Sequence, residues 1–407
     1  MGQNLPDGEG ESTDDLANVK SIQAITKNID AIFYTHYHAD HIGLFHFVSD
    51  GIPQYIGEAA QRVALCKYKR LGYIKGREEL SAKEVFKMKA MQTIAPEQTI
   101  EVGDIQITPY FVSHSAYESY MFLIEARGKR ILHTGDFRDH GYLGKRLLAM
   151  IDKLILSQGN IDILITEGTM LSRLGEKVLH ENELKNNVIK VMKQYKNVFV
   201  MCSSTDMERL ATFHAANKTV GQRPFVCDDF QKDILEIFTD IAGRHSSLFD
   251  FGDPYEFSDR NTKLMRWMQN KGFCILVRAT SKFERYLASL KSVMDKNDTV
   301  LIYSMWKEYM NPTSRHSKKQ FLDFAQRFPN TIKIHTSGHA SPECLAKVCN
   351  LVNPTLGIIP IHSEHSADYQ LLPISDTLKS KIITKSKSYN QVIVNISQNE
   401  RKVKYND

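Results

Sequence analysis

Short apolar runs that end abruptly in polar residues recur along the chain. These runs are Ala31–Tyr34, Ile105–Val112, Tyr120–Thr134 with a turn at Arg127-Gly128-Lys129, Ile161–Thr166, Thr331–His335 and Leu356–Ile361. Runs of this length, rich in β-branched residues and bounded by turn residues, predict strands. Because sheet proteins usually place their chemistry on the loops at one edge of the sheet, we expect the polar residues that follow these strands to converge on one site.

Between about Glu183 and Asn330 the pattern changes to strand-like runs that alternate with helix-like runs. The predicted strands are Asn197–Met201, Pro224–Cys227, Phe273–Val277 and Thr299–Tyr303, and the predicted helices are Met207–Ala216, Phe230–Ala242, Phe283–Met294 and Lys318–Phe328. Repeated β-then-α units predict a mostly parallel sheet covered on both faces. Since strands of the first kind resume afterwards, we interpret this region as an inserted domain, with divisions at 1–182, 183–330 and 331–407. The tail, Lys-rich over Lys379–Lys387 and β-branched over Val392–Val394, predicts closing strands.

Composition narrows the class of protein without choosing a function. The chain has 407 residues, 42% of them hydrophobic, and a formal net charge of +5, which is typical of a soluble globular protein but too small to establish a nucleic-acid partner. No apolar run approaches the ~18 residues of a membrane span, and the acidic start does not resemble a signal peptide. The six scattered cysteines form no C-x-x-C pair, which predicts reduced thiols and a cytoplasmic location.

The densest group of candidate metal ligands follows the first predicted strand. His36, His38, Asp40 and His41 form the pattern H-x-H-x-D-H. Imidazole and carboxylate ligands in so short a loop suit zinc or a similar metal. A chance cluster of surface histidines is the alternative, which the flanking strand and the turn at Gly43 disfavour. His114 and Asp136, taken singly, could be a structural histidine and a helix N-cap, and only the complete set favours ligands.

The polar stretches resemble those of the metallo-β-lactamase fold hydrolases, whose first metal signature is H-x-H-x-D-H, and within them the β-CASP branch and proteins similar to ribonuclease J. The resembling stretches are Tyr34–Gly43, Val112–Ser115, His133–Arg138 (H-T-G-D-F-R), Thr166–Thr169, Thr336–Ala340 (T-S-G-H-A) and Pro360–Glu364 (P-I-H-S-E). Together they span nearly the whole chain. The resemblance implies an α/β protein, an αββα sandwich built from both chain ends with an inserted parallel-sheet α/β β-CASP domain.

The same resemblance implies two bound zinc ions, with manganese as an alternative. The ligands carried over are His36, His38 and His114 for one ion, Asp40, His41 and His362 for the other, and Asp136 between the two. Two ions about 3.5–4 Å apart can share a hydroxide, supply a nucleophile at neutral pH and stabilise charge on a phosphoryl transition state. This chemistry suits phosphodiester hydrolysis.

Two further residues match the catalytic motifs of the β-CASP branch. Glu167 matches the first motif and His339 the second, and in the family this histidine lies near the leaving oxygen while the carboxylate orients it. A histidine whose pKa is raised by a carboxylate can donate a proton to that oxygen. The alternatives are a strand-end capping role for Glu167 and a phosphate-contacting or structural role for His339. His362 occupies the third position, where members that act on RNA tend to have His and members that act on DNA tend to have Val.

Residues that could contact RNA are indicated less specifically. Ser203 and Ser204 precede a predicted helix whose N-terminus could hold a phosphate, although ordinary capping explains them as well. Arg278 and Lys282 could contact phosphates or could be solvated surface charges, and Trp306 could stack on a base or pack into the core. The basic and aromatic stretch Lys67–Arg77 is explained best as a solvated helix face.

Two departures from the family pattern limit these expectations. The chain begins where relatives have the end of an early strand, and we therefore expect an exposed, aggregation-prone strand edge. Ribonuclease J also carries a Gly-Ser-Gln-Gly loop that helps hold a 5′-phosphate, whereas the comparable positions here are Leu276–Lys282 and Tyr303–Trp306. The sequence therefore does not decide whether activity depends on a 5′-phosphate.

The resemblance, together with these residues, implies a zinc-dependent ribonuclease that leaves 5′-phosphate and 3′-hydroxyl ends, with Asp40 among the catalytic residues, acting as an endonuclease, a 5′-exonuclease or both. RNA is the expected partner, and a homodimer is a further expectation. One alternative is a small-molecule metallo-hydrolase acting on thioesters or lactones, which leaves the inserted domain, Glu167 and His339 unexplained. The other is a non-catalytic RNA-binding member, although such proteins usually lose metal ligands.

Overall fold

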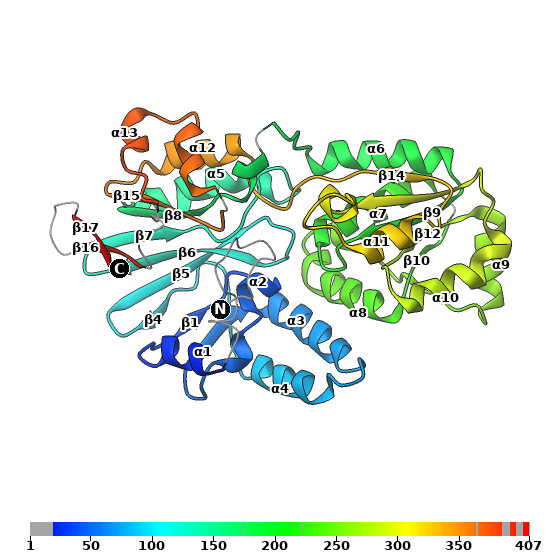
Figure 1. Cartoon of the computed structure of the whole chain (residues 1–407), viewed down its shortest axis with the longest axis horizontal. Helices are drawn as coiled ribbons and strands as arrows, with labels where there is room; N and C mark the ends of the chain where they lie inside the picture. Colours follow the sequence, from blue (N-terminus) through cyan, green and yellow to red (C-terminus); the bar gives the residue numbers. More distant parts are fainter. Residues whose placement is uncertain are drawn as a thin grey trace.

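A mixed six-stranded sheet forms the centre of one lobe of the molecule (Figure 1). We describe a computed structural model, which covers residues 19–173, 175–221, 223–363, 365–384, 391–395 and 402–406. In sheet order the strands are β15 (Gly357–Ile361), β8 (Ile163–Glu167), β7 (Lys129–His133), β6 (Ser119–Ala126), β5 (Ile105–Val112) and β4 (Ile100–Val102). β4 to β7 are antiparallel, and the predicted hairpin turns at Arg127 and Gly128, which both have positive φ as a tight hairpin requires.

A smaller parallel sheet packs against this one. It contains β1 (Ile32–Phe33), β2 (Gln54–Gly57) and β3 (Gln92–Ile94), and an apolar layer that includes Phe33, Tyr55 and Phe122 fills the space between the two sheets. The helices α1 (Val19–Thr26), α3 (Glu58–Leu71) and α4 (Glu78–Lys89) lie on the side of the small sheet, and α5 (Leu147–Met150) and α12 (Pro342–Val352) pack on the large one. The predicted αββα sandwich is therefore confirmed.

The strand that precedes the histidine-rich stretch lies at a sheet edge. Among the described residues β1 pairs with β2 alone, as we expected for this strand. Its two residues are partly buried rather than fully exposed, and aggregation through this edge stays a prediction.

The second lobe contains a fully parallel six-stranded sheet, as the alternating pattern predicted. Its strands, in sheet order, are β11 (Tyr255–Glu256), β10 (Phe225–Cys227), β12 (Phe273–Leu276), β9 (Asn197–Cys202), β13 (Thr299–Ser304) and β14 (Thr331–Lys333). Its helices are α6 (Glu181–Gln194), α7 (Met207–Val220), α8 (Asp229–Phe238), α9 (Thr262–Lys271), α10 (Ser281–Leu290) and α11 (Lys319–Ala325). This is the inserted parallel-sheet domain of the predicted fold class.

One predicted strand belongs to a different sheet from the one we expected. The run Thr331–His335 was assigned to the core that follows the insertion, but its strand β14 forms hydrogen bonds with β13 of the parallel sheet. A three-residue strand with exposed Thr331 and Lys333 carries no signal in its sequence for one sheet over the other. We propose that the insertion extends from about residue 181, where α6 begins, to residue 333.

The remaining elements are short. They are α2 (Ala39–Ile42), α13 (Asp376–Lys379) and an antiparallel pair, β16 (Gln391–Asn395) and β17 (Lys402–Asn406). The strand predicted at Val392–Val394 lies in β16, but among the described residues this pair joins no other sheet. The second half of the Lys379–Lys387 stretch and Glu364 of the P-I-H-S-E motif lie outside the described residues. None of the described helices has the length and hydrophobicity needed to cross a membrane.

Candidate metal centre

Loops that follow five strands bring the predicted ligands to one place. The H-x-H-x-D-H segment follows β1, His114 follows β5, Asp136 follows β7, His339 follows β14 and His362 follows β15. Gly135 makes one of these approaches possible, because its φ is +55° and a Cβ there would lie 2.8 Å from the carbonyl oxygen of Tyr120. The gathering of polar residues at strand ends is thus as expected.

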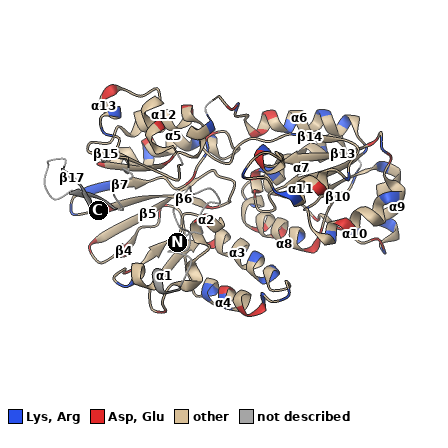
Figure 2. Ribbon diagram, in the orientation of Figure 1, with Lys and Arg blue, Asp and Glu red and all other residues tan. Residues whose placement is uncertain are grey.

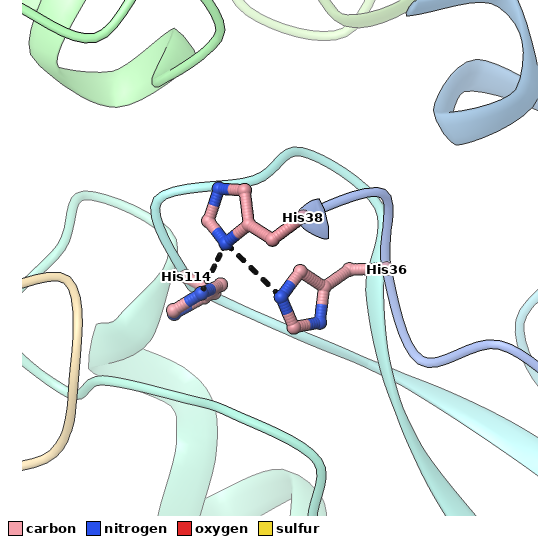
Figure 3. Close-up of side chains that lie close together, drawn as sticks. All are labelled: His36, His38 and His114. Atoms are coloured by element: carbon pink, nitrogen blue, oxygen red, sulfur yellow. Dashed lines mark hydrogen bonds between the residues drawn. The ribbon is translucent and has the colours of Figure 1, made fainter. Parts of the chain in front are cut away.

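Three histidines form the first ligand group (Figure 3). The Nδ1 atom of His38 lies 3.1 Å from Nε2 of His36 and 3.2 Å from Nε2 of His114. Burial, with smaller effects of neighbouring histidines, holds the pKa of His36 and of His114 well below the ordinary value, and burial lowers that of His38 to about 4. Neutral imidazoles with converging nitrogens are the form in which histidine binds a metal ion.

Asp40, His41 and His362 form the second group. The Oδ2 atom of Asp40 lies 3.0 Å from Nε2 of His362 and 3.6 Å from Nε2 of His41. Asp136 lies between the two groups, because its Oδ2 atom is 3.0 Å from Nε2 of His41, 3.6 Å from Nε2 of His362 and 3.9 Å from Nε2 of His36. One carboxylate oxygen therefore faces nitrogens of both groups, as a bridging ligand does.

The ring nitrogens that do not converge are held by neighbouring groups. Thr35 Oγ1 lies 3.1 Å from Nδ1 of His36, the carbonyl oxygen of Gly338 lies 2.7 Å from Nδ1 of His114, and Thr169 Oγ1 lies 2.7 Å from Nδ1 of His362. Such partners fix the tautomer and orientation of ligand histidines. The sequence analysis assigned no role to these three residues, and only the position of Thr35 directly before His36 could have suggested one.

Unsatisfied buried atoms test whether this site fits a metal ion. Both carboxylate oxygens of Asp136 and Nε2 of His41 are buried and form no hydrogen bond, although two of these atoms are 3.0 Å apart. Burial would raise the pKa of Asp136, but His41 and His362 outweigh it and hold that pKa well below the ordinary value. A buried carboxylate without hydrogen-bond donors is costly in a folded protein. The mixed nitrogen and oxygen donors fit a divalent ion such as zinc.

Glu167 and His339 lie in contact beside the ligand groups. Glu167 is fully buried, and its Oε2 atom lies 3.0 Å from Nδ1 of His339. Its Oε1 atom accepts hydrogen bonds from the backbone N–H groups of Phe137 at 3.0 Å and Ala340 at 3.3 Å. The carboxylate is therefore fixed, and it orients the ring of His339, whose side chain keeps 20% of its surface exposed.

Four of the weaker RNA-contact candidates, Ser203, Ser204, Arg278 and Lys282, lie together near Asp228. Arg278 donates to Ser204 Oγ at 3.2 Å, and both Arg278 and Lys282 form ion pairs with the buried Asp228. Ser203 lies in the same loop, which is tied to the metal signature because the hydroxyl of Tyr37 donates to the carbonyl of Thr205 at 2.8 Å. The positive charges that sequence reasoning offered to phosphates are thus balanced by Asp228 and its neighbour Asp229.

Trp306 does not present a free ring for base stacking. The guanidinium of Arg173 lies 4.0 Å from its ring centroid, and the ring of His316 lies 4.7 Å from it. The Lys67–Arg77 stretch is a solvated helix face only in part, because α3 ends at Leu71, Tyr68 is buried, and Arg70 and Arg77 form ion pairs with Asp229 and Glu84. Figure 2 shows Lys and Arg interspersed with Asp and Glu along helices such as α4 and α10.

A buried ion cluster behind the ligand loops was missed by sequence reasoning. Its members are Arg138, Glu181, Asp206, Glu208 and Arg209, all nearly or fully buried. In the sequence Arg138 stands out only as the last residue of the H-T-G-D-F-R motif. No local pattern could have shown its partners, because they come from α6 and α7 of the other lobe.

The chain is similar in sequence and in fold to known proteins. Residues 14–183 match the beta-lactamase superfamily domain. The chain is 20% identical to Ribonuclease J of Mycoplasma genitalium over 374 residues and 24% identical to Ribonuclease J of Thermus thermophilus over 361 residues, covering 87% and 84% of this chain. It spans 62% and 60% of the length of these two relatives. A crystal structure of a protein of unknown function from Enterococcus faecalis V583 shares the fold, with a TM-score of 0.65 at 18% identity over 88% of this chain and 79% of that one.

Proposed function

We propose that this chain, which is similar to ribonuclease J and matches the beta-lactamase superfamily domain over residues 14–183, hydrolyses the phosphodiester bonds of RNA with two divalent ions, zinc in the first place and manganese as the alternative. The observation that carries the proposal is the position of Asp136. One of its oxygens faces both ligand groups, and the Glu167–His339 pair lies beside them, with His339 Nδ1 3.8 Å from that same oxygen.

The residues that would hold the ions follow from the two groups. His36, His38 and His114 would bind one ion, Asp40, His41 and His362 the other, and Asp136 both. When bound, two such ions lower the pKa of water and stabilise negative charge on a phosphoryl group. In the first group His36 and His114 are buried and His38 is half-buried, whereas Asp40, His41 and His362 keep 25%, 18% and 12% of their side-chain surface exposed. Substrate would therefore approach from the side of the second group.

His339 would supply the proton that the leaving oxygen needs. Its Nδ1 atom lies 3.0 Å from Oε2 of Glu167, which orients the ring. The other ring nitrogen can then donate to the departing 3′ oxygen, which gives 3′-hydroxyl and 5′-phosphate ends. Glu167 acts here as a positioning residue, since both of its oxygens are already engaged by His339 and backbone N–H groups.

End-labelled RNA tests the proposal directly. Purified protein is given RNAs with 5′-hydroxyl, monophosphate or triphosphate ends, beside thioester and lactone substrates, and product lengths and end groups are read. We expect RNA cleavage with 5′-phosphate products and no ester turnover; ester turnover without RNA cleavage would contradict the proposal. Internal cuts indifferent to the 5′ end would identify an endonuclease, and mononucleotides an exonuclease.

A histidine substitution tests the proton donor. General acid catalysis is worth about 10²- to 10⁴-fold, and His339→Ala should lower turnover by such a factor while the protein keeps its metal content. His245→Ala, an exposed histidine in the other lobe, is the matched control and should change neither. An unchanged rate for His339→Ala would remove this residue from the mechanism. The expected homodimer is a separate prediction, for which sedimentation is the measurement.

A further inference from the structure

One buried histidine outside the ligand groups contacts both connections between the two lobes. His140 lies two positions after the H-T-G-D-F-R motif and is 2% exposed. Its carbonyl oxygen accepts a hydrogen bond from the N–H of Glu181, the first residue of α6, at 3.0 Å. Its Nε2 atom lies 2.7 Å from the carbonyl oxygen of Ser337, in the segment that follows β14. This histidine therefore contacts the chain where it enters the inserted domain and where it returns.

The bond to Ser337 fixes the ring of His140. A carbonyl oxygen can only accept, so Nε2 carries the proton, and 2.7 Å is at the short end of the range for such bonds. The guanidinium of Arg138 donates to the same oxygen at 3.4 Å. The other ring nitrogen, Nδ1, is buried without a hydrogen-bond partner, and the nearest carboxylate oxygen, of Asp139, lies 3.7 Å away. Among the described residues, Ser337 is thus the one hydrogen-bond partner of this ring.

The segment held by this ring carries the proposed proton donor. The N–H of His339 donates to Oγ of Ser337 at 3.1 Å, and between the two residues the carbonyl oxygen of Gly338 lies 2.7 Å from Nδ1 of the ligand His114. The backbone here is closely packed, because a Cβ on Gly338 would lie 2.5 Å from Oγ of Ser115. A displacement of the Ser337 carbonyl would therefore move the backbone that carries His339.

We propose that His140 is a positioning residue for the proton transfer, because its ring holds the carbonyl of Ser337 and so fixes His339 relative to the candidate metal centre. Glu167 orients the ring of His339 through its side chain, whereas His140 acts through the backbone. The inference rests on the proposed function, in which His339 is the proton donor. A catalytic group misplaced by about 1 Å can lower a rate by roughly 10²-fold, so one such hydrogen bond can have a large effect.

Three substitutions of His140 test the hydrogen bond. His140→Leu removes the donor and should lower kcat for RNA cleavage by about tenfold to a hundredfold, with KM and metal content unchanged. His140→Gln can place an amide N–H close to the position of Nε2 and should restore most of the rate. His140→Asn, whose amide lies one bond closer to the backbone, should not. The last two variants are both polar, so their comparison remains informative if His140→Leu does not fold.

Two further measurements separate positioning from a general distortion of the site. If His140 acts through His339, the double variant His140→Leu/His339→Ala should cleave RNA no more slowly than His339→Ala alone. Bis(p-nitrophenyl) phosphate has a leaving group that departs without a proton, so both single variants should hydrolyse it at the wild-type rate. A distorted metal centre would lower the rate on this substrate as well.

His214→Leu is the matched control, since His214 is a buried histidine of α7 that packs between Phe225 and Phe251. It should leave kcat unchanged. Equal losses of His140→Leu on both substrates, multiplicative effects in the double variant, or equal rates of the Gln and Asn variants would overturn the positioning role. RNA cleavage that is sensitive to His339→Ala but not to His140→Leu would overturn this role alone, and an unchanged rate for His339→Ala would overturn the proton donor of the proposed function.

Discussion

The candidate metal centre and the ion cluster behind it are both buried and polar, yet they differ in how their polar atoms are hydrogen-bonded. In the cluster, Arg209 donates to Glu181 at 2.8 and 3.1 Å, to Ser304 at 2.7 Å and to the carbonyl of Thr336 at 3.1 Å. In the metal centre, neither carboxylate oxygen of Asp136 has a hydrogen-bond donor, and its Oδ2 atom faces nitrogens of His41 and His362 instead. Buried charges with hydrogen-bonded partners hold a fold in one arrangement, whereas a buried carboxylate that faces several histidine nitrogens fits an ion.

Hydrogen bonds also connect the ion cluster with the loops of the candidate metal centre, so the cluster can fix the positions of those loops. Ser113, directly before the ligand His114, donates to Glu208, and the backbone N–H of Arg138, two residues after Asp136, donates to the carbonyl of Ser113 at 2.7 Å. Arg138 also donates to the carbonyl of Ser337, two residues before His339, at 3.4 Å. The cluster therefore positions three ligand-bearing or catalytic loops against α6 and α7 of the other lobe.

The largest effect should come from removing the bridging carboxylate. We expect Asp136→Asn to lose metal, as measured by mass spectrometry of the purified protein, and to lower RNA cleavage at least ~10³-fold, which corresponds to about 4 kcal/mol of barrier. Its free energy of unfolding in chelator should not exceed that of the wild type, because His41 and His362 hold the pKa of Asp136 well below the ordinary value and so favour its ionised form in the folded protein. The exposed Asp152→Asn is the control. Metal retention by Asp136→Asn would contradict the bridging role.

Substitution in the ion cluster should lower stability and leave metal binding of the folded protein intact. Arg209→Met leaves Glu181 short of its main partner, and breaking a buried ion pair in this way costs about 3–5 kcal/mol, measured by urea unfolding. The folded fraction should still bind metal. Arg244→Met, which breaks a pair between side chains that are 72% and 40% exposed, is the control and should cost less than about 1 kcal/mol. Equal costs for the two substitutions would mean that the cluster does not hold the lobes together.

The sequence was sufficient to predict which side chains gather at the candidate metal centre and insufficient for the cluster, for a physical reason. His36 to His41 lie within one short segment after β1, and the other candidate ligands follow strands whose apolar runs are visible locally. Arg209 and Glu181, by contrast, are 28 positions apart on two helices, and helix α6 was not among those predicted. A polar residue on a helix has the same local pattern whether it faces water or a buried partner, so neither its burial nor its partner can be read from the chain.

The charges of Arg278 and Lys282 illustrate the same limit. From the sequence these residues could contact phosphates or be solvated surface charges, and their ion pairs with Asp228, about 50 positions earlier, are not visible in the local pattern. The assignment of Thr331–His335 to the core that follows the insertion was wrong for the same reason. Its strand β14 pairs with β13, which is distant in the sequence, and the local pattern does not show this pairing. Predictions from the sequence were correct where the local pattern determines the structure. They were insufficient where a partner distant in the sequence determines it.

A third kind of buried polar group, a single carboxylate, should make stability depend on pH. Glu118 accepts a hydrogen bond from the N–H of Ala60 at 3.0 Å, near the start of α3, yet burial raises its pKa from 4.5 to about 7. The folded state therefore holds a proton that the unfolded state releases above pH 4.5. Stability is full below that pH and falls as the pH rises through 7, by up to ~3 kcal/mol.

Glu118→Gln removes this titration. Thermal unfolding should show the variant more stable than the wild type at pH 8 and equal to it near pH 4.5, whereas the exposed Glu101→Gln should follow the wild type at both. A variant that is less stable at pH 8 would show that the ionised carboxylate stabilises the start of α3 more than its burial costs.

The smallest effect should come from an exposed pair between the lobes. Arg62 of α3 lies 2.7 Å from Asp240, and the two side chains are 36% and 40% exposed. A double-mutant cycle with Arg62→Ala and Asp240→Ala should give a coupling below about 1 kcal/mol that decreases as salt is added. A coupling as large as that of the Arg209–Glu181 pair, measured in the same way, would mean that exposed pairs hold the lobes together as firmly as the buried cluster does. The comparison of the exposed pair with the buried ion cluster predicts instead that the association of the two lobes depends on buried charges that all have hydrogen-bond partners.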